Sequence, residues 1–98
     1  MKNKNNTCPV HKTAHLLSDM WTMLIFRQLL VTPAGFCELE RSLEGISPRT
    51  LTLKLKKLEA EKLIKKAKDS IYELTKKGKG LEMVIDAMRN YGKKYLES

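Results

Sequence analysis

The sequence predicts a mainly α-helical domain that carries one small β-hairpin. Three observations support this prediction. Apolar residues recur at spacings of three and four through most of the chain, which is the period of a helix with one buried face. Residues 63–67 and 71–74 have the pattern of two short strands joined by a tight turn. The chain has 98 residues, of which 42% are hydrophobic, so residues 1–98 hold one modest core and form a single domain.

The N-terminal half predicts three helices. Residues 1–7 are polar and are expected to be flexible, and a short first helix follows over residues 10–17. Ser18 is expected to cap a second helix. Its inward face is predicted to carry Met20, Trp21, Leu24, Ile25, Leu29 and Leu30. A third helix is expected over residues 36–43, with Phe36, Leu39 and Leu43 inward.

A capped fourth helix follows a glycine turn at Gly45. Ser47 is expected to be its N-cap, and Pro48 stands at the first helical position, where its missing N–H has no cost. The leucines predicted to face inward are Leu51, Leu55 and Leu58. After the hairpin, Thr75 is expected to cap one last helix that runs to near the C-terminus.

Positive charge is concentrated in the middle of the chain. The formal net charge is +8, and residues 47–80 hold eleven Lys and Arg against four Asp and Glu. Such a block favours nucleic acid first and an anionic membrane surface second. No apolar run reaches the about 20 residues of a membrane span, and the N-terminus lacks the apolar stretch of a secretory signal. We therefore expect a cytoplasmic protein with reduced cysteines, no membrane partner, no cofactor and no small-molecule substrate.

The fourth predicted helix has the pattern of a DNA-reading element. At about 100° per residue its three leucines share one face, and Arg49, Thr52 and Lys56 form a stripe on the other side. An arginine near a helix start can contact a guanine edge, and threonine can contact a base or a thymine methyl. Leu53 lies beside this stripe, either packed on thymine methyls or simply exposed. Lysines 54, 56 and 57 are expected to neutralise phosphates.

A short helix, a glycine turn, a basic helix and a basic hairpin follow one another in the order of a winged helix-turn-helix. The hairpin adds lysines that can meet phosphates beside the groove that the helix enters. The candidate DNA-binding residues are Ser47, Pro48, Arg49, Thr50, Thr52, Leu53, Lys56, Lys57, Lys65, Lys66 and Lys68.

Landmarks from Cys8 to Tyr91 resemble the HxlR-type transcription regulators, a MarR-like winged-helix family of prokaryotes. They include Gly45-Ile46-Ser47-Pro48-Arg49-x-Leu51 and Tyr72-x-Leu74-Thr75-x-x-Gly78. The resemblance implies a homodimeric, nucleoid-associated DNA-binding regulator, expected to act as a repressor, whose first and last helices form the dimer. The hairpin would be a wing shorter than the family's usual one, so we expect it to contact phosphates.

The last predicted helix carries a stripe at the spacing of coiled-coil a and d positions. Its members are Leu81, Val84, Met88, Tyr91 and Tyr95, with Ile85 beside them. Part of this face can pack on the chain's own core, but a chain of 98 residues has little core to cover so long a stripe. We expect residues 81–98 to pair with a second copy, which would place two recognition helices about 34 Å apart on a palindromic operator.

Cys8 is the candidate redox-sensing residue. It stands at a predicted helix start within residues 1–15, which hold lysines and no acid, and both features favour the reactive thiolate. Several family members sense thiol-reactive stress through a cysteine at this position. Oxidation or modification of Cys8 would then change DNA affinity. An inert cysteine is the alternative, and a disulfide with Cys37, within or between subunits, stays open.

The spacing of Cys8, His11 and His15 matches C-x2-H-x3-H, which is a zinc-ligand pattern. Pro9 lies inside the pattern, and histidine is not typical of these positions in the family. Two surface histidines without a metal are therefore the favoured interpretation.

Competing functions are weaker. A winged helix used only for protein–protein assembly is the alternative, but it needs no basic face. An enzyme is rejected because the sequence has no nucleophile–base constellation, no phosphate-binding glycine loop and no carboxylate pair. Membrane-surface binding is disfavoured because the lysines do not lie opposite an apolar stripe.

Overall fold

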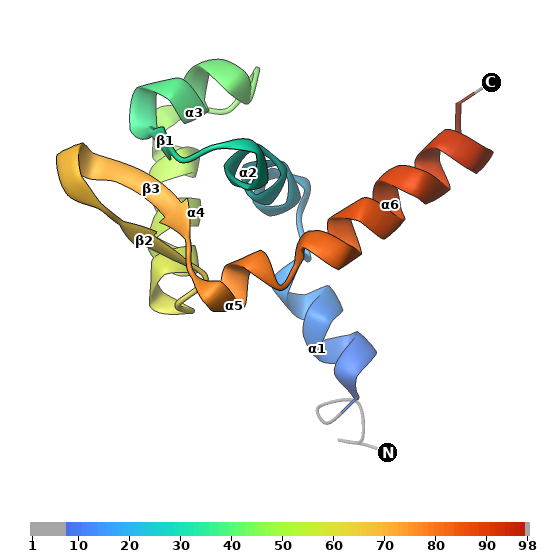
Figure 1. Cartoon of the computed structure of the whole chain (residues 1–98). Helices are drawn as coiled ribbons and strands as arrows, with labels where there is room; N and C mark the ends of the chain where they lie inside the picture. The colour runs from blue at the N-terminus through green and yellow to red at the C-terminus, as the bar shows by residue number, and fades with distance from the viewer. Residues whose placement is uncertain (1–7, 98) are drawn as a thin grey trace.

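The computed structural model describes residues 8–97, in which a small sheet lies at one side of a group of helices (Figure 1). The elements are α1 (Pro9–Leu16), α2 (Met20–Val31), β1 (Ala34–Gly35), α3 (Phe36–Ser42), α4 (Pro48–Ala60), β2 (Ile64–Lys66), the 3₁₀ turn η2 (Lys68–Ser70), β3 (Ile71–Leu74), α5 (Lys76–Lys79) and α6 (Glu82–Tyr95). The predicted mainly helical fold with one hairpin is confirmed. The prediction of a flexible segment over residues 1–7 lies outside the described residues.

The central helix α2 begins one residue later than predicted. Asp19, not Ser18, is its N-cap, because the Asp19 carboxylate accepts the backbone N–H of Thr22 at 2.8 Å. A carboxylate also interacts favourably with the positive end of the helix dipole. Met20 was predicted to face inward but is 61% exposed, whereas Phe26 is fully buried. The helix is therefore covered on more than the one face that the spacing predicts.

The helix-turn-helix is formed by α3 and α4. Gly45 lies between them with φ of +94°, a conformation that other residues rarely adopt. Ser47 caps α4 as predicted, since its hydroxyl oxygen accepts the backbone N–H of Thr50 at 3.1 Å, and Pro48 is the first helical residue. The three leucines of α4 that were predicted to face inward are buried, which leaves the opposite face of the helix toward solvent.

β3 is the central strand of a three-stranded antiparallel sheet in the order β1-β3-β2. The predicted hairpin is β2 and β3, and Asp69 and Ser70 at its tip have φ of 61° and 58°. β1 was not predicted, because two residues are too short to show a strand pattern. Its Ala34 pairs with Tyr72, so the chain after α2 is joined to the hairpin.

The predicted last helix is two helices. Thr75 caps α5 as expected, with its hydroxyl oxygen accepting the N–H of Gly78 at 3.1 Å. The helix then breaks at Gly80 and Leu81, where glycine weakens the helical turn. Leu81 and Ile85 are buried, and beyond them α6 projects away from the body (Figure 1). α1 projects as well, in a different direction.

Gly78 stands where no side chain fits. A Cβ atom there would overlap the backbone carbonyl oxygen of Leu63, so α5 would have to move away from the start of β2. We expect Gly78→Ala to lower the free energy of unfolding by about 2–4 kcal/mol. A Cβ atom at Gly92 would meet no other atom within 4 Å, so Gly92→Ala should instead stabilise α6 by about 0.5–1 kcal/mol. Urea unfolding measures the free energy of unfolding of both variants. Equal changes in the two would contradict the close contact between Gly78 and the Leu63 carbonyl.

Candidate nucleic-acid interface

The outward face of α4 is open to solvent. Arg49, Thr52 and Lys56 are exposed, as the helical spacing predicts. Lys57 beside them is exposed too, and Leu53 is 59% exposed. The face therefore combines a guanidinium, a hydroxyl, two ammonium groups and one apolar side chain on a helix whose other side is fixed in the core.

The start of α4 contributes its capping residues to the same region. Ser47 and Pro48 are exposed, whereas Thr50 is half-buried. The hydroxyl of Ser47 donates to the hydroxyl oxygen of Thr50 at 2.9 Å. Thr50 therefore takes part in the cap, and its contact with DNA remains a prediction.

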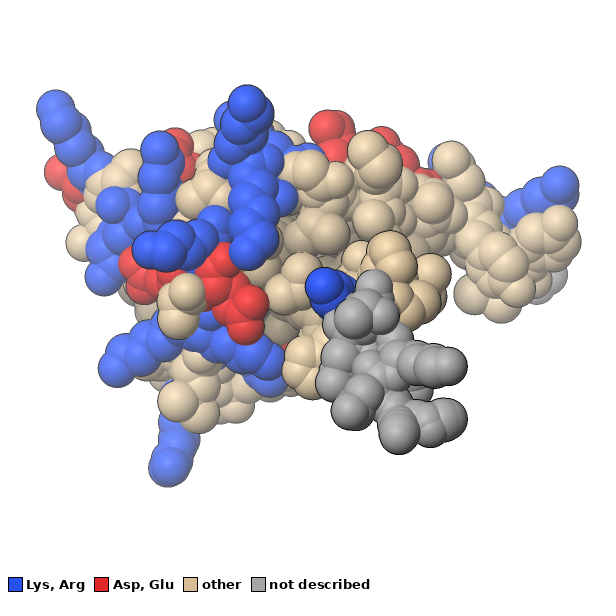
Figure 2. Space-filling model, turned by 90° about the horizontal axis from the view of Figure 1, so that it is seen from below, with Lys and Arg blue, Asp and Glu red and all other residues tan. Residues whose placement is uncertain are grey.

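The hairpin supplies a second group of positive charges. Lys65, Lys66 and Lys68 are exposed. Lys65 Nζ lies 3.6 Å from a carboxylate oxygen of Glu73, and Lys66 Nζ lies 5.4 Å from the centre of the Tyr72 ring. Figure 2 shows basic side chains gathered at the end of the molecule that holds the hairpin and α4, with some acidic side chains among them. A polyanion would meet a cluster of positive charges there.

Lys54 does not belong to this face. Its Nζ lies 3.0 Å from Oδ2 of Asp19, and its side chain is 27% exposed. The prediction that Lys54 neutralises a phosphate is therefore replaced by a contact between α4 and the start of α2. Sequence reasoning missed this pair because its members are 35 residues apart and no local pattern links them.

The pKa of the Asp19 carboxyl lies below its ordinary value of 3.8. Burial by itself raises this pKa, but hydrogen bonds from the Thr22 backbone, from Lys54 and from the Thr22 hydroxyl outweigh burial. Because the pKa is lower in the folded chain, the stabilisation is complete above pH 3.8 and is lost as the pH falls through the folded value.

We expect wild type to be more stable than Asp19→Asn near neutral pH, and the difference to shrink toward zero in acid below the folded pKa. Asparagine keeps the oxygen that caps α2 but removes the charge and the second acceptor oxygen, which binds Lys54 and the Thr22 hydroxyl. Urea unfolding of both proteins over a pH series measures the difference. A difference that does not change with pH would show that the charge of Asp19 has no role in stability.

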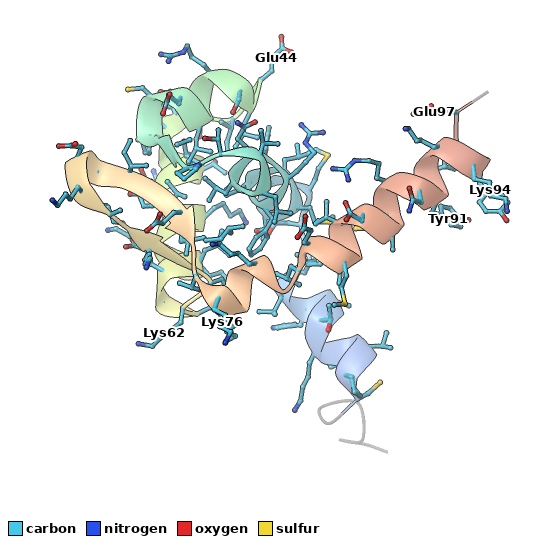
Figure 3. All side chains as sticks on the ribbon, in the orientation of Figure 1. Glu44, Lys62, Lys76, Tyr91, Lys94 and Glu97 are labelled. Atoms are coloured by element: carbon cyan, nitrogen blue, oxygen red, sulfur yellow. The ribbon has the colours of Figure 1, made fainter. Side chains whose placement is uncertain are left out.

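The predicted dimer stripe of α6 divides into two parts. Leu81 and Ile85 are 8% and 6% exposed, so these two side chains pack in the chain's own core, which corrects the prediction that they face a partner. Val84 packs against the core but is only half-buried, so its contact with a partner stays a prediction. The outer part is exposed and comprises Met88 at 45%, Tyr91 at 59% and Tyr95 at 61%. Figure 3 shows Tyr91 on the projecting part of α6.

Cys8 is the N-cap of α1 and is half-buried, and Cys37 is exposed in the first turn of α3. Both thiols are free. α1 and α3 lie at opposite ends of the molecule (Figure 1). A disulfide needs Cα atoms within about 7 Å, so a bond between these two cysteines of one chain would require a large rearrangement.

His11 and His15 are exposed on α1, and their ring centres lie 6.4 Å apart. Within residues 8–97, His, Cys, Asp and Glu side chains do not gather in threes as metal ligands would. In the same part of the chain, no helix combines the length and the apolar character needed to cross a membrane.

Comparisons with known proteins find helix-turn-helix transcriptional regulators. The model of the HxlR-like helix-turn-helix family matches residues 16–98. YvaP of Bacillus subtilis, an HTH-type transcriptional regulator, is 33% identical, over 97% of this chain and 94% of its own length. A transcriptional regulator of the MarR family from Porphyromonas gingivalis superposes with a TM-score of 0.87 at 31% identity, covering 97% of this chain and 99% of the other. Quinone-bound YodB from Bacillus subtilis superposes with a TM-score of 0.81 at 30% identity, covering 91% of this chain and 100% of the other.

Proposed function

We propose that this chain, which belongs to the HxlR-like helix-turn-helix family of transcriptional regulators, binds double-stranded DNA sequence-specifically through α4 and the hairpin. One observation carries the proposal. α4 buries Leu51, Leu55 and Leu58 in the core. Its other side leaves Arg49, Thr52 and Lys56 exposed. A helix fixed in this way can enter the major groove with its polar stripe toward the base edges.

Each exposed side chain then has a separate role. Arg49, near the start of α4, is placed to donate two hydrogen bonds to a guanine edge, and Thr52 to contact a base or a thymine methyl. Lys56 and Lys57 neutralise phosphates at the edge of the groove. The hairpin lysines do the same on the neighbouring backbone. Leu53 can pack on thymine methyls without a hydrogen bond.

We also propose that the chain acts as a homodimer on a palindromic operator and represses transcription by occupying it. The exposed side chains of Met88, Tyr91 and Tyr95 form an apolar surface on a helix that projects from the body. α1 adds Val10, which is 76% exposed. A two-fold pair of such surfaces would present two copies of α4 to successive turns of the same duplex.

Selection of bound duplexes from a random pool tests this function. We expect enrichment of one sequence with two inverted half-sites, spaced by about one helical turn. The alternative function, a winged helix that only assembles with other proteins, predicts recovery of no particular sequence. That outcome would overturn the proposal.

We propose further that modification of Cys8 switches DNA binding. Cys8 is half-buried at the end of a projecting helix, and the relative YodB has been solved with bound quinone. The Cys8 thiolate could add to an electrophilic carbon of a quinone. Alternatively, the Cys8 thiols of two copies could give two electrons and two protons to diamide, which becomes the hydrazine as one disulfide forms. Either change would alter the position of α1.

We expect diamide or a quinone to weaken binding of the selected duplex by wild type by about tenfold or more, the range of a typical coupling between two sites. Cys8→Ser should not respond, whereas the matched control Cys37→Ser should respond as wild type does. Fluorescence anisotropy with a labelled duplex measures the change. Equal responses of wild type and Cys8→Ser would remove Cys8 from the switch.

A further inference from the structure

We propose that Asp19 is a positioning residue for DNA recognition, which fixes the orientation of α4 through its ion pair with Lys54. This inference rests on the proposed function of α4 in reading DNA. It concerns two side chains that are outside the proposed DNA-binding face and that would touch no base or phosphate themselves.

The Asp19 carboxylate holds two helices at once. Oδ1 accepts the backbone N–H of Thr22 at 2.8 Å, and Oδ2 accepts the Thr22 hydroxyl at 3.0 Å. Oδ2 also accepts a hydrogen bond from Lys54 Nζ at 3.0 Å. Since Thr22 is only 3% exposed, the carboxylate is bound to a buried residue in the first turn of α2, and Lys54 is bound to that fixed carboxylate.

The position of Lys54 on α4 separates it from the DNA-binding face. At about 100° per residue, Lys54 lies about 60° to one side of Leu51, whereas Thr52 lies about 100° to the other side. The ion pair therefore restrains α4 from the flank that faces α2. A rotation of α4 about its own axis, which would move Arg49 and Thr52 away from their bases, would have to break this pair.

The pair differs in kind from the other ion pairs of the described chain. Residues 8–97 form three, and the other two lie within the hairpin and within α6. Among these three described pairs, only that of Asp19 with Lys54 joins two helices. Both side chains are partly exposed, at 30% and 27%, and partly exposed pairs add little to stability. Base recognition depends more strongly on such a pair than stability does, because the side chains that contact bases must be held within about 0.5 Å of their productive positions.

Loss of the pair has a specific consequence for DNA binding. Without it α4 still folds on its leucines, so the positive face survives and binding to any duplex continues. Discrimination between duplexes should fall, because the base-contacting side chains are no longer held in register. The expected signature is a loss of specificity while the phosphates stay neutralised.

The test uses the full chain, the duplex recovered by selection and an unrelated duplex of equal length. Asp19→Asn keeps the cap of α2, and Lys54→Met keeps the aliphatic stem of the lysine. We expect each variant to lower the ratio of the two affinities by about tenfold, the scale of a single base contact. The double variant should lose no more than either single one, because both changes break the same pair.

Lys57→Met is the matched control, since Lys57 is an exposed lysine on the same helix. It should reduce the slope of log affinity against log salt by about 0.9 for each phosphate that is no longer neutralised, and leave the ratio nearly unchanged. Lys54→Met should leave the slope unchanged. Circular dichroism melting checks folding, and if Asp19→Asn is unfolded, Lys54→Met alone carries the test.

Three results would overturn the inference: an unchanged ratio in Lys54→Met, a reduced salt slope in Lys54→Met, or additive losses in the double variant. If wild type shows no preference for the selected duplex, the proposed function and the inference both fail. If wild type and Lys57→Met behave as expected while the two pair variants match wild type, the inference alone fails.

Discussion

Reversal of charge at Arg49 and Lys56 to glutamate is expected to weaken binding of the selected duplex at least about a hundredfold. Arg49 would lose a bidentate contact with guanine, which is worth about 1–3 kcal/mol, and both carboxylates would be repelled by phosphates. Both side chains are exposed, so neither change disturbs the core. Fluorescence anisotropy at one fixed salt concentration measures the loss.

A matched control reverses two charges outside the DNA-binding face. Arg27 on α2 and Lys93 on α6 are exposed, and their replacement by glutamate changes the net charge by the same amount. We expect this variant to lose far less affinity, through the long-range field alone. Equal losses in the two double variants would mean that net charge, and not the face of α4, accounts for binding.

Replacement of Tyr91 by glutamate is expected to convert the proposed dimer to monomers. Tyr91 is 59% exposed on the projecting part of α6, and its ring centre lies 4.9 Å from that of Tyr95. A carboxylate in the middle of this apolar surface would be buried without a partner on association. Analytical ultracentrifugation measures the mass, and the palindromic duplex should be bound at least about tenfold more weakly, because two half-sites are no longer linked.

Met83→Glu is the matched control for this surface. Met83 is 74% exposed on α6. At about 100° per residue it lies about 80° around the helix from Tyr91, about 120° from Tyr95 and about 140° from Met88. It should remain a dimer. Truncation after Lys79 is a poorer test, because it also removes Leu81 and Ile85 from the core. Monomers from Met83→Glu, or dimers from Tyr91→Glu, would place the interface elsewhere.

The parts of the fold that were predicted correctly depend on local chemistry. Ser47 and Pro48 mark the start of α4 through the hydrogen-bonding and φ preferences of single residues. Gly45 marks the turn because it adopts a positive φ. The leucine spacing of α4 shows which face is buried, and that in turn identifies the exposed stripe.

The features that were missed depend on contacts between distant parts of the chain. The pair of Asp19 with Lys54 joins residues 35 apart, and β1 exists only because Ala34 and Gly35 meet β3. The break before α6 could be suspected from Gly80 but not located, since the core decides where Leu81 turns inward. Burial of Leu81 and Ile85 also divides the apolar stripe of α6 into a core part and an exposed part. A spacing of three and four cannot show where this division falls.

The salt dependence of duplex binding tests most directly whether α4 and the hairpin form the DNA-binding face. Each neutralised phosphate contributes about 0.9 to the slope of log affinity against log salt. We predict a slope of about −4 or steeper for wild type, and a shallower slope when Lys65, Lys66 and Lys68 are all replaced by glutamine. A nearly flat dependence for wild type, or an unchanged slope in the glutamine variant, would contradict this assignment.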